Sequence, residues 1–230
     1  MFALTPLEAE ALGLSLRIAF VCVLASLPFG IAVAWLLARR DFPGKTLIDG
    51  LVHAPLVVPP VAVGYILLVL FGRNGPIGAW LYGAFGITVV FTWKGAALAS
   101  AVMAFPLMVR AIRLALELVD RRIETAARTL GAGPWRVAFT VTLPLALPGI
   151  LTGMILAFAR SLGEFGATIT FVSNIPGETR TLPIALYALV QTPGGEAGAL
   201  RLVIISLALA LAALAFSEVL ARRVGARLRG

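Results

Sequence analysis

The sequence predicts an all-α membrane protein, and three observations lead to this fold class. Of its 230 residues, 60% are hydrophobic and only 13% are charged, whereas about a quarter of the residues in a soluble domain are charged. The mean hydropathy is correspondingly high, at +0.99. The apolar residues are also gathered in continuous blocks, which favours membrane-spanning helices and excludes a β-barrel of alternating strands. No polar linker divides the chain, so we expect residues 1–230 to form a single domain.

About five blocks reach the length of roughly 20 apolar residues that a spanning helix requires, which predicts a polytopic helical bundle. These blocks lie near residues 13–37, 51–71, 88–109, 147–171 and 200–220. The second block begins with the run APLVVPPVAVGY at 54–65, which contains three prolines. Because proline removes a backbone hydrogen bond and kinks a helix, this run predicts a reshaped start of the second span. Such breaks suit a bundle that encloses a path and moves, although ordinary kinked packing explains each proline taken singly.

The basic residues predict the orientation of these spans. Most of them follow the first, third and fifth blocks, whereas the loops on the other side contain only Arg73 and Arg180. By the positive-inside rule, this asymmetry predicts an N-terminus outside the cell and a C-terminus inside it. The basic loops also suit contact with the anionic lipid of the inner leaflet. The net charge of +8 therefore reflects topology, because the basic residues form no patch with interleaved aromatics of the kind that binds nucleic acid.

The longest inner loop, at about residues 118–145, predicts two short helices joined by a turn. LVDRRIETAARTLGA is typical of a helix that Asp120 caps and Gly131 ends, and PWRVAFTVTLP of a second helix from Pro134 to Pro144. Their apolar faces are small and rich in alanine, and not bulky and aromatic. Such faces favour docking into a socket of another protein over lying on the bilayer as an interfacial helix.

This segment resembles the cytoplasmic motif of ABC-importer permeases, in which Glu-Ala-Ala, three residues, Gly, nine residues and Ile-x-Leu-Pro follow one another. The alanine pair, the glycine and the final Leu-Pro pair are present at 126–127, 131 and 143–144. Thr125 stands at the usual glutamate position, with Glu124 one residue earlier, and Val141 replaces the isoleucine. The resemblance implies a coupling helix that docks into a groove of an ATPase subunit. The contact residues that it implies are Glu124, Ala126, Ala127, Arg128, Leu130, Gly131 and Pro134.

Over nearly its whole length, the chain resembles the permease subunits of bacterial molybdate importers. The longest matching stretch is FARSLGEFGATITFVSNIPGETRTLP at 158–183. The resemblance implies a type I importer fold in the bacterial inner membrane and molybdate transport by alternating access. It also implies a second permease copy, two ATPase subunits that hold ATP and Mg, and a periplasmic oxyanion-binding protein, with no cofactor in this chain. Sulfate and tungstate permeases share SLGEFGA-like sequence, so those two ions remain alternatives.

Polar residues near the end of the fourth block are candidates for the translocation pathway. Arg160 and Glu164 lie one helical turn apart and so share a helix face. Ionisable groups inside a membrane span usually face the bundle interior or water. They form either a mutually neutralising structural pair or a site at which Arg160 attracts an oxyanion and Glu164 limits how tightly it binds. Thr168 and Thr170 follow as hydroxyl donors, for which generic helix packing is the alternative explanation.

The stretch SNIPGETRTLP at 173–183 is an outer loop in this topology. Its turn residues and the cation Arg180 are compatible with a simple solvated loop. The family resemblance implies instead a contact with the periplasmic binding protein, for which Asn174 and Arg180 are the candidate residues.

Two other classes of function are less well supported. An intramembrane enzyme could use Glu164 and His53, but these residues lie at different expected depths, and His53 has no second metal ligand nearby in sequence. A passive membrane scaffold explains neither the proline-broken spans nor the inner insert. No phosphate-binding loop of the form G-x-x-x-x-G-K-[ST] occurs in the sequence. We therefore expect a transport subunit, and not an enzyme, that is driven by a separate ATPase.

Overall fold

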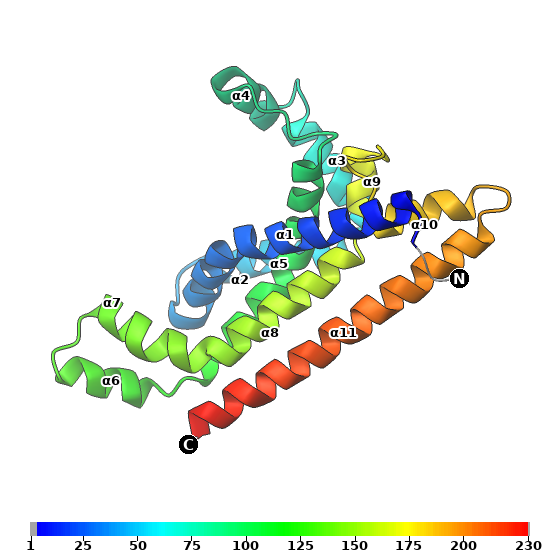
Figure 1. Cartoon of the computed structure of the whole chain (residues 1–230). Coiled ribbons are helices and arrows are strands. Elements are labelled where there is room, and N and C mark those ends of the chain that lie inside the picture. The colour runs from blue at the N-terminus through cyan, green and yellow to red at the C-terminus, as the bar shows by residue number, and fades with distance from the viewer. Residues whose placement is uncertain (1–3, 230) are drawn as a thin grey trace.

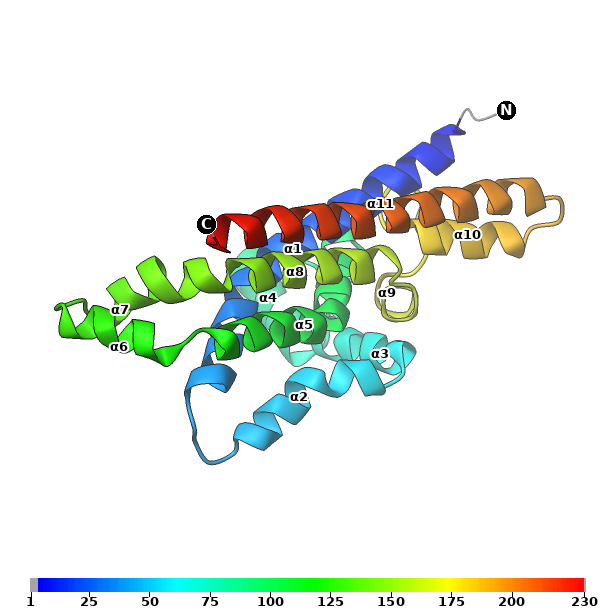
Figure 2. The same cartoon turned by 90° about the horizontal axis from the view of Figure 1, so that it is seen from below.

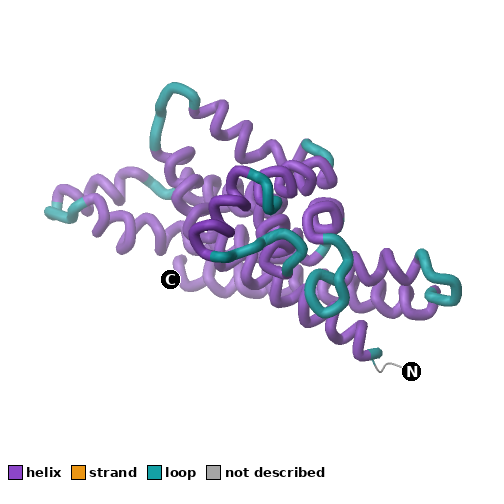
Figure 3. The backbone as a smooth tube through the Cα atoms, turned by 90° about the horizontal axis from the view of Figure 1, so that it is seen from above, coloured by secondary structure: helices purple, strands orange, loops and turns teal. Residues whose placement is uncertain are grey.

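The computed structural model describes residues 4–229 and contains helices but no strand in that range, which confirms the all-α class (Figure 3). The first helix, α1 (Pro6–Arg39), begins at a capping box. The Thr5 hydroxyl accepts a hydrogen bond from the Glu8 amide at 3.3 Å, and the Glu8 carboxylate accepts one from the Thr5 amide at 2.9 Å. This helix contains the span predicted at 13–37.

The second predicted span, at 51–71, is not a single straight helix. It is divided between α2 (Lys45–Val57) and α3 (Pro60–Phe71), which are bent by 114° relative to one another. The bend falls at Val58 and Pro59, where the extended backbone before Pro60 interrupts the helical hydrogen bonds. The reshaped start of the second span is therefore confirmed, and it amounts to a full break.

The third predicted span corresponds to α5 (Trp93–Leu118), which begins later than residue 88 because Thr92 is its N-cap. The Thr92 hydroxyl accepts a hydrogen bond from the Gly95 amide at 3.3 Å. Between α3 and α5, the short helix α4 (Pro76–Phe85) packs chiefly against α3. Figure 1 shows α4 projecting away from the rest of the bundle.

The segment predicted as two short helices differs from expectation in its second half. The first helix is α6 (Arg121–Thr129), as expected. The second does not end at Pro144, because α7 (Pro134–Val137), a π-helical turn η1 (Ala138–Thr142) and α8 (Leu143–Leu162) follow one another without interruption. The wider π-helical turn lies just before Pro144, where the missing amide and the bulk of the ring disfavour a regular helix. The helix passes through the proline instead of stopping there.

The fourth predicted span, at 147–171, is also divided. The helix α8 ends at Leu162, and α9 (Gly166–Val172) begins after a break at 163–165. The chain continues through α10 (Leu182–Val190) into α11 (Glu196–Arg229), which contains the span predicted at 200–220. By length and composition, four helical segments of the described chain could cross a membrane, or up to five if the bent pair α2–α3 counts as one span.

The core is centred on α5, which packs against both α1 and α8. Leu37 of α1, Met108 of α5 and Ala157 of α8 are fully buried there, and so is the single cysteine, Cys22. A second core cluster joins α3, α5 and α9. In that cluster a Cβ atom at Gly64 would lie 2.5 Å from the carbonyl oxygen of Ala167, so glycine is required for the close approach of α3 to α9.

Candidate functional site

The segment from α6 to η1, residues 121–142, forms a hairpin at one end of the molecule, and we call it the α6–α7 hairpin. Figures 1 and 2 show it at the opposite end from the N-terminus and from the turn between α10 and α11. Its first helix has the predicted caps. The Asp120 carboxylate accepts a hydrogen bond from the Arg122 amide at 2.8 Å, and Gly131 ends the helix with a φ of 86°.

Most of the predicted coupling residues lie on the surface of this hairpin. Leu130 is 89% exposed. The half-buried Ala127 is the least exposed of the following group: Ala126, Ala127, Arg128, Gly131 and Pro134. The structure thus brings these residues together on one projecting tip, where another protein could contact them.

Two aromatic side chains make this tip bulkier than the sequence indicated. Trp135 and Phe139 are 77% and 63% exposed, and their rings stack with centroids 6.3 Å apart. The expectation of small, alanine-rich faces was therefore wrong for the second half of the hairpin. The spacing of the two aromatics by one helical turn was the signal that could have revealed this patch, because such residues share a helix face.

Glu124 does not share the exposed position of its neighbours. It is only 8% exposed. Its Oε1 atom accepts hydrogen bonds from Nη2 of Arg39 at 2.9 Å and from the Thr142 hydroxyl at 2.7 Å. The carboxylate thus faces the last residue of α1 and the last residue of η1, and Thr125 occupies the exposed position beside it.

At the other end of α8, Arg160 and Glu164 meet as predicted. Nη1 of Arg160 lies 2.8 Å from Oε2 of Glu164, whose side chain is 2% exposed. The second carboxylate oxygen of Glu164 accepts a hydrogen bond from the Ala167 amide at 2.8 Å, in the first turn of α9. Glu164 thus neutralises Arg160 and binds an amide in the first turn of α9, which fits the alternative of a structural ion pair. The Arg160 side chain remains 28% exposed.

The two predicted threonine donors are engaged with the backbone. The Thr168 hydroxyl donates to the carbonyl of Phe165 at 2.9 Å, and the Thr170 hydroxyl donates to the carbonyl of Gly166 at 2.9 Å. Such bonds to the preceding turn are common for threonine in helices. In this conformation both hydroxyl protons are used in bonds to backbone carbonyls.

Asn174 and Arg180 come together in the loop between α9 and α10. Nε of Arg180 donates to Oδ1 of Asn174 at 2.8 Å, and both residues are half-buried. Glu178 of the same loop accepts a hydrogen bond from the Trp93 amide at 3.2 Å, at the start of α5. This hydrogen bond connects the loop to the start of α5.

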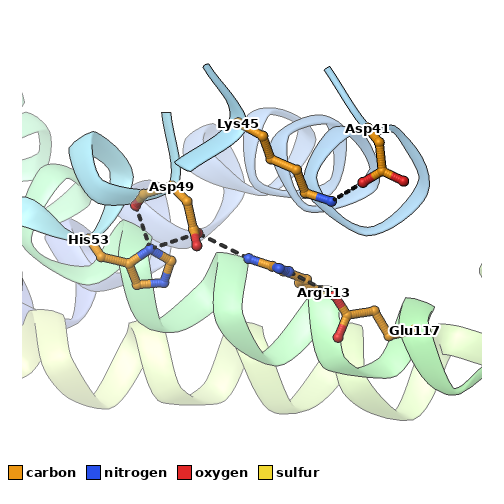
Figure 4. A network of polar contacts seen from close by, with 6 residues as sticks. All are labelled: Asp41, Lys45, Asp49, His53, Arg113 and Glu117. Carbon is orange, nitrogen blue, oxygen red and sulfur yellow. Dashed lines mark hydrogen bonds and ion pairs between the residues drawn. The ribbon is translucent and has the colours of Figure 1, made fainter. Parts of the chain in front are cut away.

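A polar network that the sequence did not reveal joins α2 to α5 (Figure 4). Arg113 contacts Asp49 at 3.0 Å and Glu117 at 2.8 Å, and Nδ1 of His53 lies 3.3 Å from the Asp49 carboxylate. His53 therefore belongs to this network, whereas Glu164 pairs with Arg160, and the pairing considered for an intramembrane enzyme is not formed.

Beside this network, Lys45, the first residue of α2, donates to Asp41 of the preceding loop at 2.9 Å. This hydrogen bond holds the pKa of the exposed Asp41 carboxyl below its usual value.

A groove of about 570 Å³ between α5 and α8 was also not predicted. Leu107, Leu114 and Pro148 are among the residues that make it largely apolar, and Arg110 and Thr152 are its polar lining. It lies open on the surface of this single chain.

Comparison with known proteins now decides the family. The sequence profile described as binding-protein-dependent transport system inner membrane component matches residues 26–226. The chain belongs to this family. It is thus an inner membrane component of a transport system, a permease subunit and not an enzyme. ABC importer permeases act with ATPase and substrate-binding partners.

Individual members of this permease family are similar over most of this chain. The molybdenum transport system permease protein of Escherichia coli K12 is 68% identical over 219 residues, covering 95% of this chain and 96% of that protein. The corresponding protein of Haemophilus influenzae is 59% identical over 222 residues, covering 96% and 97%. A sulfate transport system permease protein of E. coli K12 is 39% identical over 186 residues, covering 81% and 67%.

Solved structures confirm the fold of an ABC importer permease. A bacterial alginate ABC transporter in complex with a pentasaccharide-bound periplasmic protein matches with a TM-score of 0.76 at 18% identity, covering 96% of this permease and 80% of that chain. The inward-facing methionine transporter MetNI matches with a TM-score of 0.71 at 16% identity, covering 94% and 95%.

Proposed function

We propose that this chain is the membrane subunit through which an ABC importer moves molybdate across the bacterial inner membrane by alternating access. The observation that carries the choice of ion is the difference in similarity. Identity is 68% to a molybdenum transport permease over 95% of the chain, against 39% to a sulfate permease over 81%. Sulfate and tungstate remain the competing substrates.

The proposed assembly contains two copies of this chain, two ATPase subunits and one periplasmic oxyanion-binding protein. ATP and Mg are held by the ATPase subunits, and this chain holds no cofactor. The α6–α7 hairpin lies on the cytoplasmic side, where its projecting tip docks into the ATPase. The exposed Leu130 and Trp135 support this role, because a bulky apolar anchor that fills a pocket is typical of residues that dominate a protein interface.

Movement of the hairpin reaches the membrane directly through α8. The second half of the hairpin, α7 and η1, and α8 form one continuous helix from Pro134 to Leu162, so a displacement of the tip is transmitted along the span. At the far end of α8, Glu164 neutralises Arg160 in this conformation, and the Arg160 side chain remains 28% exposed. In the proposed mechanism, Arg160 attracts the oxyanion when that pair opens, and Glu164 limits how tightly the ion is held. Thr168 and Thr170 become donors to the ion only if their backbone hydrogen bonds open. Asn174 and Arg180 contact the binding protein.

The test is uptake into sealed vesicles that contain this permease with its ATPase, supplied with ATP and a loaded molybdate-binding protein. We expect ATP-dependent accumulation of molybdate, and we expect excess sulfate not to reduce it. Tungstate is tested as a further competitor. Uptake of sulfate at the same rate as molybdate, with the cognate binding protein for each, would overturn the proposed substrate. Absence of ATP-dependent uptake of any of the three oxyanions would overturn the proposed function.

A further inference from the structure

The end of α1 and both helices of the α6–α7 hairpin meet at one buried carboxylate. Glu124 of α6 binds Arg39, which lies 85 residues away at the end of α1, and Thr142, which lies 18 residues away at the end of η1. We call these three residues the Glu124 latch. It spans the base of the α6–α7 hairpin, below the exposed tip that carries Leu130.

The latch is a costly arrangement if its purpose is stability alone. The side chains of Arg39 and Glu124 are 9% and 11% exposed, and removing two charges from water carries a desolvation penalty that one ion pair often fails to recover. Nε of Arg39 is buried and has no hydrogen-bond partner among residues 4–229. A buried pair with an unsatisfied donor is better explained by a role in fixing the relative positions of its helices.

The latch also crosses the irregular part of the helix. Thr142 is the last residue of the π-helical turn, and the regular helix α8 begins at Leu143. π-helical turns inside α-helices frequently lie at functional sites. The hydrogen bond from Thr142 to Glu124 of α6 links the two helices of the hairpin across this irregular turn, next to the start of α8.

We propose that Glu124 is a positioning residue that makes α1 and α8 move together with the α6–α7 hairpin, and that it is not itself a contact of the ATPase. This inference rests on the proposed function. A displacement of the tip reaches α8 through the continuous helix and reaches α1 through Arg39. Without the latch, the hairpin can turn about η1 while α1 stays in place, and ATP hydrolysis is no longer converted into transport.

The test compares two pairs of variants in the reconstituted complex with its ATPase and binding protein. Glu124→Gln and Thr142→Val disrupt the latch. Glu117→Gln on α5 and Thr140→Val in the same π-helical turn are their matched controls, because the Glu117 and Thr140 side chains point to local partners, Arg113 and the Arg136 carbonyl. The readouts are co-purification of the ATPase, basal ATP hydrolysis, its stimulation by loaded binding protein, and ATP consumed per molybdate transported.

We expect both latch variants to retain the ATPase subunit and basal hydrolysis but to lose at least about fivefold in stimulation, the lower range of typical coupling between sites. The controls keep the stimulation of the unaltered complex. Exchange of the pair, as Arg39→Glu with Glu124→Arg, restores part of the stimulation lost in Glu124→Gln.

Normal stimulation in Thr142→Val would overturn the inference, and this variant decides the matter even if Glu124→Gln fails to assemble, because it leaves the ion pair in place. If Glu124→Gln also loses ATPase binding in that case, Glu124 is instead a direct contact. Failure of the proposed function is distinguished by the unaltered complex, which would then show no ATP-dependent molybdate uptake.

Discussion

The two ends of the continuous helix Pro134–Leu162 are both organised by a buried glutamate, but the partners of these glutamates differ in reach. At the α9 end, Glu164 binds Arg160 and the Ala167 amide, both within four residues of it. These contacts are local, and they shape the break between two consecutive helices.

At the hairpin end, the partners of Glu124 come from other parts of the chain. Arg39 closes α1, the first helix of the protein, and Thr142 lies beyond the turn of the hairpin. A glutamate–arginine pair therefore shapes a local break at the α9 end, and a second such pair connects separate helices at the hairpin end. In this permease, the sequence distance to the partners indicates the role of a buried ion pair better than the residue types do.

The largest effect is expected from breaking the long-range pair. Arg39→Ala leaves the Glu124 carboxylate buried without its counter-ion, which typically costs about 3–5 kcal/mol. We expect a lower unfolding midpoint in detergent and faster proteolysis within residues 118–145. Arg40→Ala, at the exposed neighbouring position, is the control. Equal stability of the two variants would mean that the pair contributes nothing to holding the hairpin.

The second prediction tests whether the hairpin end is the docking end. Trp135→Ala removes an exposed aromatic anchor and should weaken binding of the ATPase by about 2 kcal/mol, or roughly thirtyfold, as for other interface anchors. The matched control is Trp80→Ala on α4, whose side chain is 62% exposed at a different place. Binding measured by titration of the purified ATPase should change only for the first variant. The reverse result would assign the docking surface to α4.

A smaller effect is expected from changing the local pair. Glu164→Gln keeps an oxygen that can accept from the Ala167 amide and removes the charge opposite Arg160. The loss of one charged hydrogen bond is worth about 1.5–3 kcal/mol, and because Arg160 is partly exposed we expect the lower value. The complex should assemble, while uptake or ATP consumed per molybdate changes. Behaviour identical to that of Glu10→Gln, an exposed position on α1, would exclude Glu164 from the transport mechanism.

The smallest effect is expected at the tip of the hairpin. Gly131 has a φ of 86° and no atom within 4 Å of an added Cβ, so Gly131→Ala changes only backbone strain, at about 1 kcal/mol. Gly133→Ala is the control, because Gly133 has a φ of −66° and also has open space around it. A difference in unfolding midpoint between the two variants checks the prediction, and no difference would show that the tip relaxes without cost.

Features with local causes could be predicted from the sequence. Asp120 and Gly131 mark the ends of α6 because a cap acts on its own helix, and the prolines at 55–60 indicated the break between α2 and α3. The contact of Arg160 with Glu164 follows from their spacing by one helical turn. The all-α class follows from the apolar blocks.

Features that depend on distant partners could not be predicted in this way. Nothing in the local pattern around Glu124 points to Arg39, so its position on the motif suggested an exposed contact. The helix continues through Pro144, just after the π-helical turn, whereas a proline considered alone indicates a helix end. The exposure of Trp135 reflects how far the hairpin projects, which only the packing of the whole bundle determines.

The burial of Cys22 has a practical consequence for following these movements. It is the single cysteine of the chain, and it is 1% exposed in the core beside α5. Thiol-reactive spin labels or fluorophores will therefore react with cysteines introduced at the surface and not with the buried Cys22. The native residue does not need to be removed. Distances between a label on the hairpin and one near α9 can then be recorded in an otherwise unaltered permease as nucleotide is added.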